Sequence, residues 1–302
     1  MTSPYLGWNK AELHSHLDGA VRISTVEELS GRTDLRMVAP DDCPSQAEYI
    51  KYFKPAIDVM QTEKALERIA LELCIDSAAE NVDYLEVRWA PRLHLEGGLT
   101  IEGVIRAVLS GLQQGPIRAV AIVCAMRRDT PEHNLELARI AGGFAGLGVV
   151  GFDLAGDEVA NPAPPQRRAF EAARAAGLHL TCHAGEAGDP SSVEDALSLG
   201  VERIAHGVIG ARDPRIVKRL RSEGIVLDMC PTANWKCKAV PALSDHPLPR
   251  LVRSGVRCTI STDSRTVADT TLSREFERMA GIGMTDDELR LCNQTAYDAR
   301  FG

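Results

Sequence analysis

Apolar runs and amphipathic runs alternate along almost the whole chain. Eight apolar, strand-favouring runs predict β-strands at residues 11–17, 84–90, 117–126, 149–154, 178–184, 203–208, 225–230 and 257–262. Between them, Leu and Ala recur at helical spacing, often after Thr, Ser or Pro, which predicts helices at 62–80, 100–114, 131–145, 164–176, 192–199, 214–223 and 247–254. Glycines at 146, 177, 224 and 255 precede strands, at positions where a helix can end in a left-handed conformation.

This alternation predicts a parallel sheet, because each strand must be followed by a crossover helix before the next parallel strand. Eight such units close into a TIM (β/α)8 barrel. A doubly wound sheet is the competing architecture, but it would not bring the ends of the first, fifth, sixth and eighth predicted strands to one point as readily. We therefore expect an α/β fold, a TIM barrel formed as a single domain over residues 1–302.

Residues 21–57 depart from the alternation. This stretch contains short helical pieces, a polar run at 40–44, and three aromatic residues, Tyr49, Tyr52 and Phe53. It follows the first predicted strand, so it would lie over the mouth of the barrel, where long insertions often serve as lids. Two interpretations stay open at this point, a helical lid and a plain structural excursion.

Composition limits the class of partner. The chain has 302 residues, 44% of them hydrophobic, with a formal charge of −8 and a pI near 5.6. An acidic surface disfavours nucleic acid and anionic membranes as partners. The N-terminus lacks the apolar run of a signal peptide, and no span reaches the roughly 18 apolar residues of a membrane helix. We expect a cytoplasmic enzyme that acts on a small molecule, with its oligomeric state left open.

The eight cysteines do not alter this picture. None forms a CxxC pair, and several lie in apolar strand-like runs, where a reduced cysteine packs as a small hydrophobic residue. Cys230 and Cys237 lie near the candidate site described next, but their spacing and flanks are not those of a zinc knuckle. We interpret all eight as packing residues.

The candidate chemistry begins with two histidines on the first predicted strand. His14 and His16 are two residues apart, so both imidazoles point to the same face of a strand. Neutral imidazoles placed side by side near a barrel end are typical of a shared cation, most often zinc. His183 ends the fifth predicted strand, and Glu186 follows three residues later, where a carboxylate beside a metal could act as a general acid or base.

Two further residues end other predicted strands. Asp263 ends the eighth strand, which is adjacent to the first in a closed barrel, and His206 ends the sixth. Three histidines and an aspartate, with one position left for water, make a catalytic rather than a structural zinc site. We therefore expect one Zn²⁺ per chain, which would lower the pKa of a bound water toward ~7, with His206 and Asp263 orienting the resulting hydroxide.

The same residues carry a resemblance to the adenosine deaminase family of the amidohydrolase barrels. The similar segments occur in the family's order and at closely similar spacings over nearly the whole chain. They are 10–20 (KAELHSHLDGA), 84–88 (YLEVR), 153–158 (DLAGDE), 183–186 (HAGE), 205–207 (AHG), 230–234 (CPTAN) and 261–263 (STD).

The resemblance implies a role for each residue. Zinc would be bound by His14, His16, His183 and Asp263. Glu186 would pass a proton to purine N1, which makes C6 electrophilic, while His206 orients the attacking hydroxide. The Gly156 backbone N–H would meet ring N3, and Asp18 would accept a hydrogen bond from a ribose hydroxyl. The predicted catalytic set is Glu186, His206 and Asp263. The predicted substrate-binding set is His16, Asp18 and Gly156, together with Ser264, Lys236, Lys238 and Arg265, at which the chain departs from the family.

Two features depart from the family pattern. Many members have a second aspartate after the zinc-binding one, which contacts purine N7, whereas this chain has Ser264. A serine hydroxyl can still donate to N7, and one such bond is worth about 1 kcal/mol. The second departure is basic, since Lys236, Lys238 and Arg265 follow the last two predicted strands.

Three cations near a substrate mouth predict an anionic group on the substrate, held by charge-assisted hydrogen bonds. A nucleotide phosphate, or the benzoate of 6-aminodeoxyfutalosine, would provide such a group, and Arg22 and Lys54 in the insertion could add to the pocket. The alternative is that these cations point outward and pair with the acidic surface.

The leading hypothesis is zinc-dependent deamination of a 6-aminopurine nucleoside. Alternatives are deamination of an anionic analogue such as 6-aminodeoxyfutalosine, of a nucleotide or of adenine, and metal-dependent amide or ester hydrolysis. Two-metal hydrolases usually need a carboxylated Lys or a Glu on the fourth strand, and residues 153–156 (DLAG) provide neither. A catalytically silent nucleoside-binding protein is a third class, disfavoured because Glu186 and every predicted zinc ligand are present.

Overall fold

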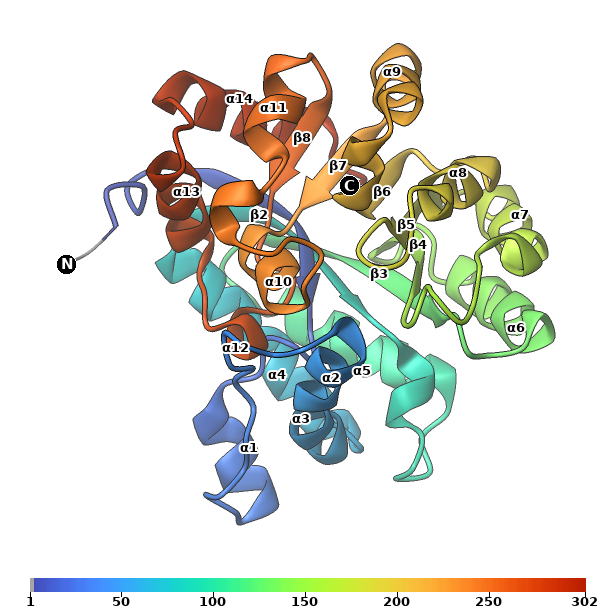
Figure 1. The fold of residues 1–302 in the computed structure, drawn as a ribbon. Helices are drawn as coiled ribbons and strands as arrows, with labels where there is room; N and C mark the ends of the chain where they lie inside the picture. Colours follow the sequence, from blue (N-terminus) through green and yellow to red (C-terminus); the bar gives the residue numbers. More distant parts are fainter. Residues whose placement is uncertain (1–2) are drawn as a thin grey trace.

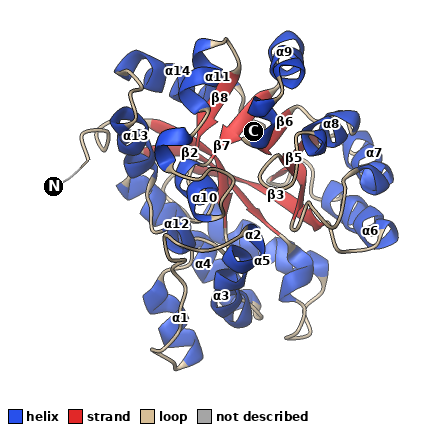
Figure 2. Cartoon of the chain, viewed as in Figure 1, coloured by secondary structure: helices blue, strands red, loops and turns tan. Residues whose placement is uncertain are grey.

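The structure is a computed structural model that describes residues 3–302. Its eight parallel strands form one sheet whose spatial order is the sequence order, and helices surround the sheet (Figures 1 and 2). The strands are β1 Lys10–His16, β2 Val82–Trp89, β3 Arg118–Met126, β4 Val149–Ala155, β5 His179–Ala184, β6 Arg203–His206, β7 Val226–Met229 and β8 Arg257–Ile260. All eight predicted strands are confirmed, with boundaries that shift by a few residues.

Helices follow the strands around the barrel. The α-helices are α1 Ile23–Ser30, α2 Gln46–Tyr49, α3 Lys54–Val59, α4 Glu63–Ala79, α5 Ile101–Gln113, α6 Pro131–Gly142, α7 Arg167–Ala175, α8 Ser191–Ser198, α9 Pro214–Glu223, α10 Pro231–Lys236, α11 Leu248–Arg253, α12 Arg265–Ala268, α13 Leu272–Gly281 and α14 Asp286–Asp298. Short 3₁₀ turns are η1 Ile50–Phe53, η2 Pro91–His94, η3 Pro164–Gln166, η4 Ile209–Arg212 and η5 Leu243–Asp245.

The sheet closes into a barrel where β8 approaches β1. A parallel bridge links Ser15 to Asp263. The His16 N–H donates to the Asp263 carbonyl at 2.6 Å, and the Asp263 N–H donates to the His14 carbonyl at 3.0 Å. Helix α14 packs against both strands. The TIM barrel prediction is confirmed, and the doubly wound alternative is wrong because the first and last strands are neighbours.

Local backbone conformation explains the differences in element boundaries. β6 ends at His206, two residues early, because His206 and Gly207 both have a φ of 74° and leave the extended conformation. The helix predicted at 131–145 ends at Gly142. Gly224 caps α9 in the left-handed conformation, as predicted. Helix α10 was not predicted, because its six residues are too few to show a helical period.

The insertion at 21–57 forms α1, α2, η1 and most of α3. Its segment from α2 to α3 lines the cavity at the barrel mouth, as the lid interpretation predicts, whereas α1 extends away from the barrel (Figure 1). The backbone of the insertion is tied to the far end of the chain, since the Ala39 N–H donates to the Val267 carbonyl at 2.9 Å. All eight cysteines are buried and unpaired, in agreement with a packing role. None of the helices formed by residues 3–302 combines the length and the apolarity that crossing a membrane requires.

Candidate metal centre and substrate pocket

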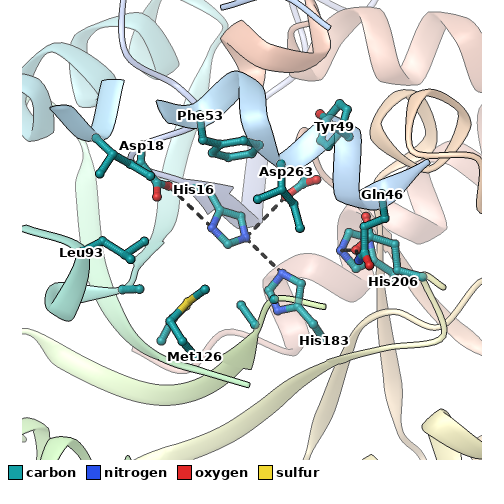
Figure 3. A pocket seen from close by; sticks show the side chains of 17 residues that line it. His16, Asp18, Gln46, Tyr49, Phe53, Leu93, Met126, His183, His206 and Asp263 are labelled. Carbon is teal, nitrogen blue, oxygen red and sulfur yellow. Dashed lines mark hydrogen bonds and ion pairs between the residues drawn. The ribbon is translucent and has the colours of Figure 1, made fainter. Parts of the chain in front are cut away.

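The predicted site residues lie at the carboxyl ends of their strands. His14 and His16 are on β1, His183 is on β5, His206 ends β6 and Asp263 follows β8. Figure 3 shows His16, His183, His206 and Asp263 close together. His206 and Asp263 have positive φ values, 74° and 62°. Residues other than glycine adopt this conformation rarely, and they do so most often at functional sites where the surrounding fold enforces it. The barrel therefore imposes these two side-chain directions.

Donor atoms from these residues converge on one point. One nitrogen each of His14, His183 and His206 and one oxygen of Asp263 all lie within 4.8 Å of one another, and all four residues are buried. His16 joins the group, with Nε2 at 3.0 Å from His183 Nε2 and 3.5 Å from Asp263 Oδ1. The structure thus brings the four predicted ligands together and places His206 beside them.

The electrostatics of this cluster suit a divalent cation. Burial lowers the pKa of His14, His16 and His206 well below the usual value, so these imidazoles are neutral and can act as ligands. Burial, and then the nearby Glu186 carboxylate, raise the pKa of Asp263 well above its usual value. Neither ring nitrogen of His14 makes a hydrogen bond within residues 3–302, although Nε2 lies 3.2 Å from Asp263 Oδ1. Neutral imidazoles with a buried carboxylate form a donor set that Zn²⁺ prefers.

A chain of hydrogen bonds fixes which nitrogen of His206 carries its proton. The Leu248 N–H donates to Nδ1 of His246 at 3.3 Å, so the His246 proton is on Nε2, which lies 3.2 Å from the Asn234 carbonyl oxygen. The Asn234 amide nitrogen therefore faces Nδ1 of His206, at 3.0 Å. Since Nδ1 accepts that bond, the His206 proton is on Nε2, which points toward Glu186 at 3.7 Å. In this arrangement the His206 Nε2–H faces the site as a hydrogen-bond donor.

A second carboxylate supports the ligand His183. Asp153 Oδ2 lies 2.9 Å from His183 Nδ1 and 3.0 Å from an Arg88 guanidinium nitrogen. Burial alone would raise the pKa of Asp153, but His183 and Arg88 outweigh it and hold that pKa well below the usual value. An ionised carboxylate behind a ligating imidazole orients the ring and increases its basicity. Sequence reasoning did not assign roles to Asp153, Asn234 or His246, although Asp153 and Asn234 lie in segments that carry the family resemblance.

The candidate metal cluster forms part of the wall of a cavity at the barrel mouth. From the barrel, the cavity is lined by His16, Asp18, Ala90, Leu93, Cys124, Met126, Ala155, Gly156, His183, Glu186, His206 and Asp263. From the lid, it is lined by Gln46, Tyr49, Ile50, Phe53 and Ile57. Figure 3 shows Asp18 and Leu93 on one side of the cluster and Gln46 and His206 on the other.

Three of the predicted substrate-binding residues line this cavity, namely His16, Asp18 and Gly156. Gly156 has a φ of 107°, and a Cβ there would lie 3.3 Å from the Met126 methyl group, so glycine leaves room for a flat ligand. Burial raises the pKa of Asp18 to about 6, and its carboxylate lies 3.8 Å from His16 Nδ1. Asp18 can therefore accept or donate a hydrogen bond near neutral pH.

The three predicted cations do not line the cavity. Lys236 donates to the Ala39 carbonyl at 2.7 Å, and Lys238 donates to the Asp41 carbonyl at 2.8 Å, so both fasten the lid segment to the barrel. Arg265 donates to the Ser77 hydroxyl at 3.2 Å. This corrects the expectation that they hold an anionic group of the substrate. Lys236 is 4% exposed, so it does not point outward, but its Nζ lies 3.5 Å from a carboxylate oxygen of Asp41, so it does pair with an acidic surface residue.

The other specificity residues are also placed differently from the prediction. Ser264 is fully buried and lies outside the cavity lining, with its hydroxyl 2.6 Å from that of Tyr49. Arg22 pairs with Asp76 at 2.6 Å, and Lys54 pairs with Asp58. Sequence reasoning missed the lid residues that do line the cavity, because only the fold shows which face of a four-residue helix points inward.

A (β/α)8 barrel with a buried His/Asp cluster at the carboxyl ends of its strands defines a metal-dependent hydrolase. Comparisons with known proteins narrow this class. Residues 9–301 match the sequence model of the family described as adenosine deaminase. An adenosine deaminase of Enterococcus faecalis is 34% identical over 308 residues, which cover 97% of this chain and 91% of that protein. The chain belongs to the adenosine deaminase family, and it is a hydrolytic deaminase of purines.

Solved structures agree with this assignment. The N6-mAMP deaminase MAPDA of Arabidopsis superposes with a TM-score of 0.89 at 27% identity, covering 99% of this chain and 95% of that one. The Arabidopsis protein ADAL, solved in complex with IMP, gives a TM-score of 0.89 at 26% identity, covering 99% and 93%. Both similarities extend over the whole barrel and the lid.

Proposed function

We propose that this protein hydrolyses the amino group of a 6-aminopurine nucleoside such as adenosine or 2′-deoxyadenosine, releasing ammonia and the 6-oxo purine. One Zn²⁺ would be held by His14, His16, His183 and Asp263. The observation that carries the proposal is the position of Glu186 and of the protonated His206 nitrogen, 3.7 Å apart beside the cluster and at one end of the cavity. A proton donor and an oriented N–H thus face the place where C6 would lie.

The metal, when bound, supplies the Lewis acidity that makes water a nucleophile at neutral pH. The chain's own residues move the protons and orient the attacking oxygen. Glu186 accepts a proton from the attacking water and delivers it to ring N1, which draws electrons away from C6. The His206 Nε2–H donates a hydrogen bond to the attacking oxygen. As the C6–N bond breaks, the remaining proton of the added water passes from the oxygen on C6 to the amino group, which leaves as ammonia with the bonding electrons while the 6-oxo group forms.

Residues at the other end of the cavity would hold the sugar. Asp18 lies there with Leu93, on the side opposite Gln46 (Figure 3), whose amide contacts Glu186. Its carboxylate can accept a hydrogen bond from a ribose hydroxyl. The Gly156 backbone N–H would meet ring N3, and the small residues Ala90 and Ala155 leave the walls flat enough for a base.

A purine nucleotide is the second candidate substrate. It is favoured by the structural similarity to an N6-mAMP deaminase and to a protein that binds IMP. In this chain, however, Lys236, Lys238 and Arg265 are occupied elsewhere, so the residues first expected to hold a phosphate or a benzoate do not support it. Adenine and 6-aminodeoxyfutalosine remain alternatives that the same assay separates.

The test is ammonia release by the purified protein, with zinc content measured on the same sample. The panel is adenosine, 2′-deoxyadenosine, adenine, AMP and 6-aminodeoxyfutalosine. We expect about one zinc per chain and fastest turnover of the plain nucleosides. Chelation should abolish turnover, and added Zn²⁺ should restore it. Turnover of the anionic compounds alone would move the assignment to the second candidate, and no turnover of any compound would refute the proposal.

A further inference from the structure

Tyr49 is a polar group of the lid that none of the proposed roles uses. It is 2% exposed, it lines the cavity, and its hydroxyl lies 2.6 Å from that of Ser264. The ring packs edge-on against Phe53, with centroids 6.0 Å apart. Gly19 makes this packing possible, because a Cβ at that position would lie 2.4 Å from Ser264 Cβ and 2.7 Å from a Phe53 ring carbon. The hydroxyl is thus held by Ser264, on a residue that forms part of the cavity wall.

Helix α2 places two polar groups across the cavity. Gln46 and Tyr49 are three residues apart, so they lie on the same face of the helix. The Gln46 amide donates to the Glu186 carboxylate, beyond the end of β5, whereas Tyr49 bonds Ser264, beyond the end of β8. Figure 3 shows Gln46 beside His206 and Tyr49 beside Asp263. Helix α2 therefore reaches from Glu186 to the end of β8.

The chemistry of a 6-aminopurine matches this span. Carbon 6 is flanked by N1 on one side and by C5, which bears N7, on the other. If Glu186 serves N1, the N7 edge faces away from Glu186 and toward the end of β8. N7 is a hydrogen-bond acceptor only, so a donor is needed there. Ser264 can donate to the Tyr49 oxygen, which leaves the Tyr49 proton free for the ligand.

We infer that the Tyr49 hydroxyl, oriented by Ser264, donates the hydrogen bond that recognises ring nitrogen 7 of the substrate. Tyr49 is then a specificity-determining residue, and Ser264 is the residue that positions it. The inference rests on the proposed function, because it assumes a purine with C6 at the metal cluster. It replaces the expectation that Ser264 itself donates to N7, since Tyr49 lines the cavity and Ser264 does not.

Product inhibition tests this assignment without depending on the reactivity of an analogue. The inhibition constants of inosine and 7-deazainosine are compared in the wild type, Tyr49→Phe, Ser264→Ala and Tyr52→Phe, all loaded with zinc. If the best substrate is not adenosine, its 6-oxo product and the 7-deaza counterpart are used instead. Tyr52→Phe is the matched control, since Tyr52 is a partly buried lid tyrosine that does not line the cavity. Melting temperature and zinc content establish that each variant is folded.

In the wild type, the 7-deaza compound should bind about five- to tenfold more weakly, which corresponds to the loss of one hydrogen bond. Tyr49→Phe should reduce this ratio to about one, Ser264→Ala should reduce it partly, and Tyr52→Phe should leave it unchanged. A ratio that survives in Tyr49→Phe, or a wild-type ratio near one, would overturn the inference. So would loss of the ratio in Ser264→Ala alone. The proposed function fails separately, through the absence of ammonia release.

Discussion

Charged side chains are buried both at the mouth of the barrel and deep in its interior, but they are arranged in opposite ways. In the interior, Arg203 pairs with Glu86 and lies 3.3 Å from Asp228, while its guanidinium stacks 3.7 Å from the Phe301 ring centre. At the mouth, the buried Asp263 carboxyl has neutral imidazoles beside it, with His14 Nε2 at 3.2 Å and His16 Nε2 at 3.5 Å, and Asp263 has a positive φ. The interior charges are neutralised by the chain itself.

This contrast separates stability from function. A buried ion pair holds the fold, and removing one partner leaves an uncompensated charge. A buried carboxyl among neutral imidazoles lacks an opposite charge, which a bound cation would supply. Asp153 connects the two regions, since it faces Arg88 on one side and His183 on the other. Substitutions at the mouth should therefore alter catalysis, and substitutions in the interior should alter stability.

The largest effect is expected at the mouth. Glu186→Gln should lower kcat by about three to four orders of magnitude, or about 4–5 kcal/mol, because the amide cannot carry the proton to the ring. Zinc content and melting temperature should stay close to those of the wild type. Steady-state kinetics measures kcat, and metal analysis and thermal unfolding measure the other two quantities. The control is Glu171→Gln, which changes an exposed glutamate on α7. A variant that keeps its activity would remove Glu186 from its proposed role.

The matching change in the interior is Arg203→Met. It removes the partner of two buried carboxylates and the contact with the Ala299 carbonyl, so the free energy of unfolding should fall by about 3–4 kcal/mol. Turnover per folded, zinc-loaded molecule should be preserved. Urea unfolding measures the loss. Arg215→Met is the control, because Arg215 forms an exposed pair with Asp213 and should change stability by less than about 0.5 kcal/mol. If the two variants are equally stable, the interior network does not hold the fold.

Glu158 is a buried carboxyl outside both the metal cluster and the Arg203 network, and its raised pKa predicts that the stability of the fold depends on pH. It is 6% exposed, one oxygen accepts the Ala187 N–H, the other has no partner, and burial raises its pKa to about 7 from 4.5. A carboxyl that binds its proton more tightly when folded stabilises the folded state at low pH, and this contribution is lost as the pH rises from 4.5 through 7.

Glu158→Gln removes this ionisation, and its side-chain oxygen can still accept the Ala187 N–H. The variant should therefore be more stable than the wild type at pH 8, by about 2 kcal/mol, and the difference should shrink toward pH 5. Unfolding midpoints at both pH values test this expectation. A difference that is constant with pH would show that Glu158 is not protonated on folding.

The smallest effect concerns the lid. Lys236→Met removes the bond to the Ala39 carbonyl, so the lid should close less often and KM should rise about fivefold with little change in kcat, which corresponds to about 1 kcal/mol. Lys238→Met, whose bond to Asp41 is exposed, should change KM by less than about twofold. If KM rises for anionic substrates only, the lysines act on the substrate after all.

Much of the fold followed from local pattern. The apolar strand runs and the helical periods between them predicted eight strand–helix units. Eight such units, paired in sequence order, form a closed barrel. Short elements were missed, since α10 and α12 contain too few residues to show a period. β6 ended early because the positive φ at His206 is imposed by the site rather than by propensity.

The sequence by itself determined which residues could form the metal cluster, because residues that end parallel strands must meet at one mouth of a barrel. It also determined the place of the lid. Only the tertiary structure decided where the specificity residues point. Lys236 meets Ala39 across 197 positions and Tyr49 meets Ser264 across 215, and such contacts depend on how the lid packs. A side chain's direction is set by its neighbours in space, and a linear pattern does not contain them.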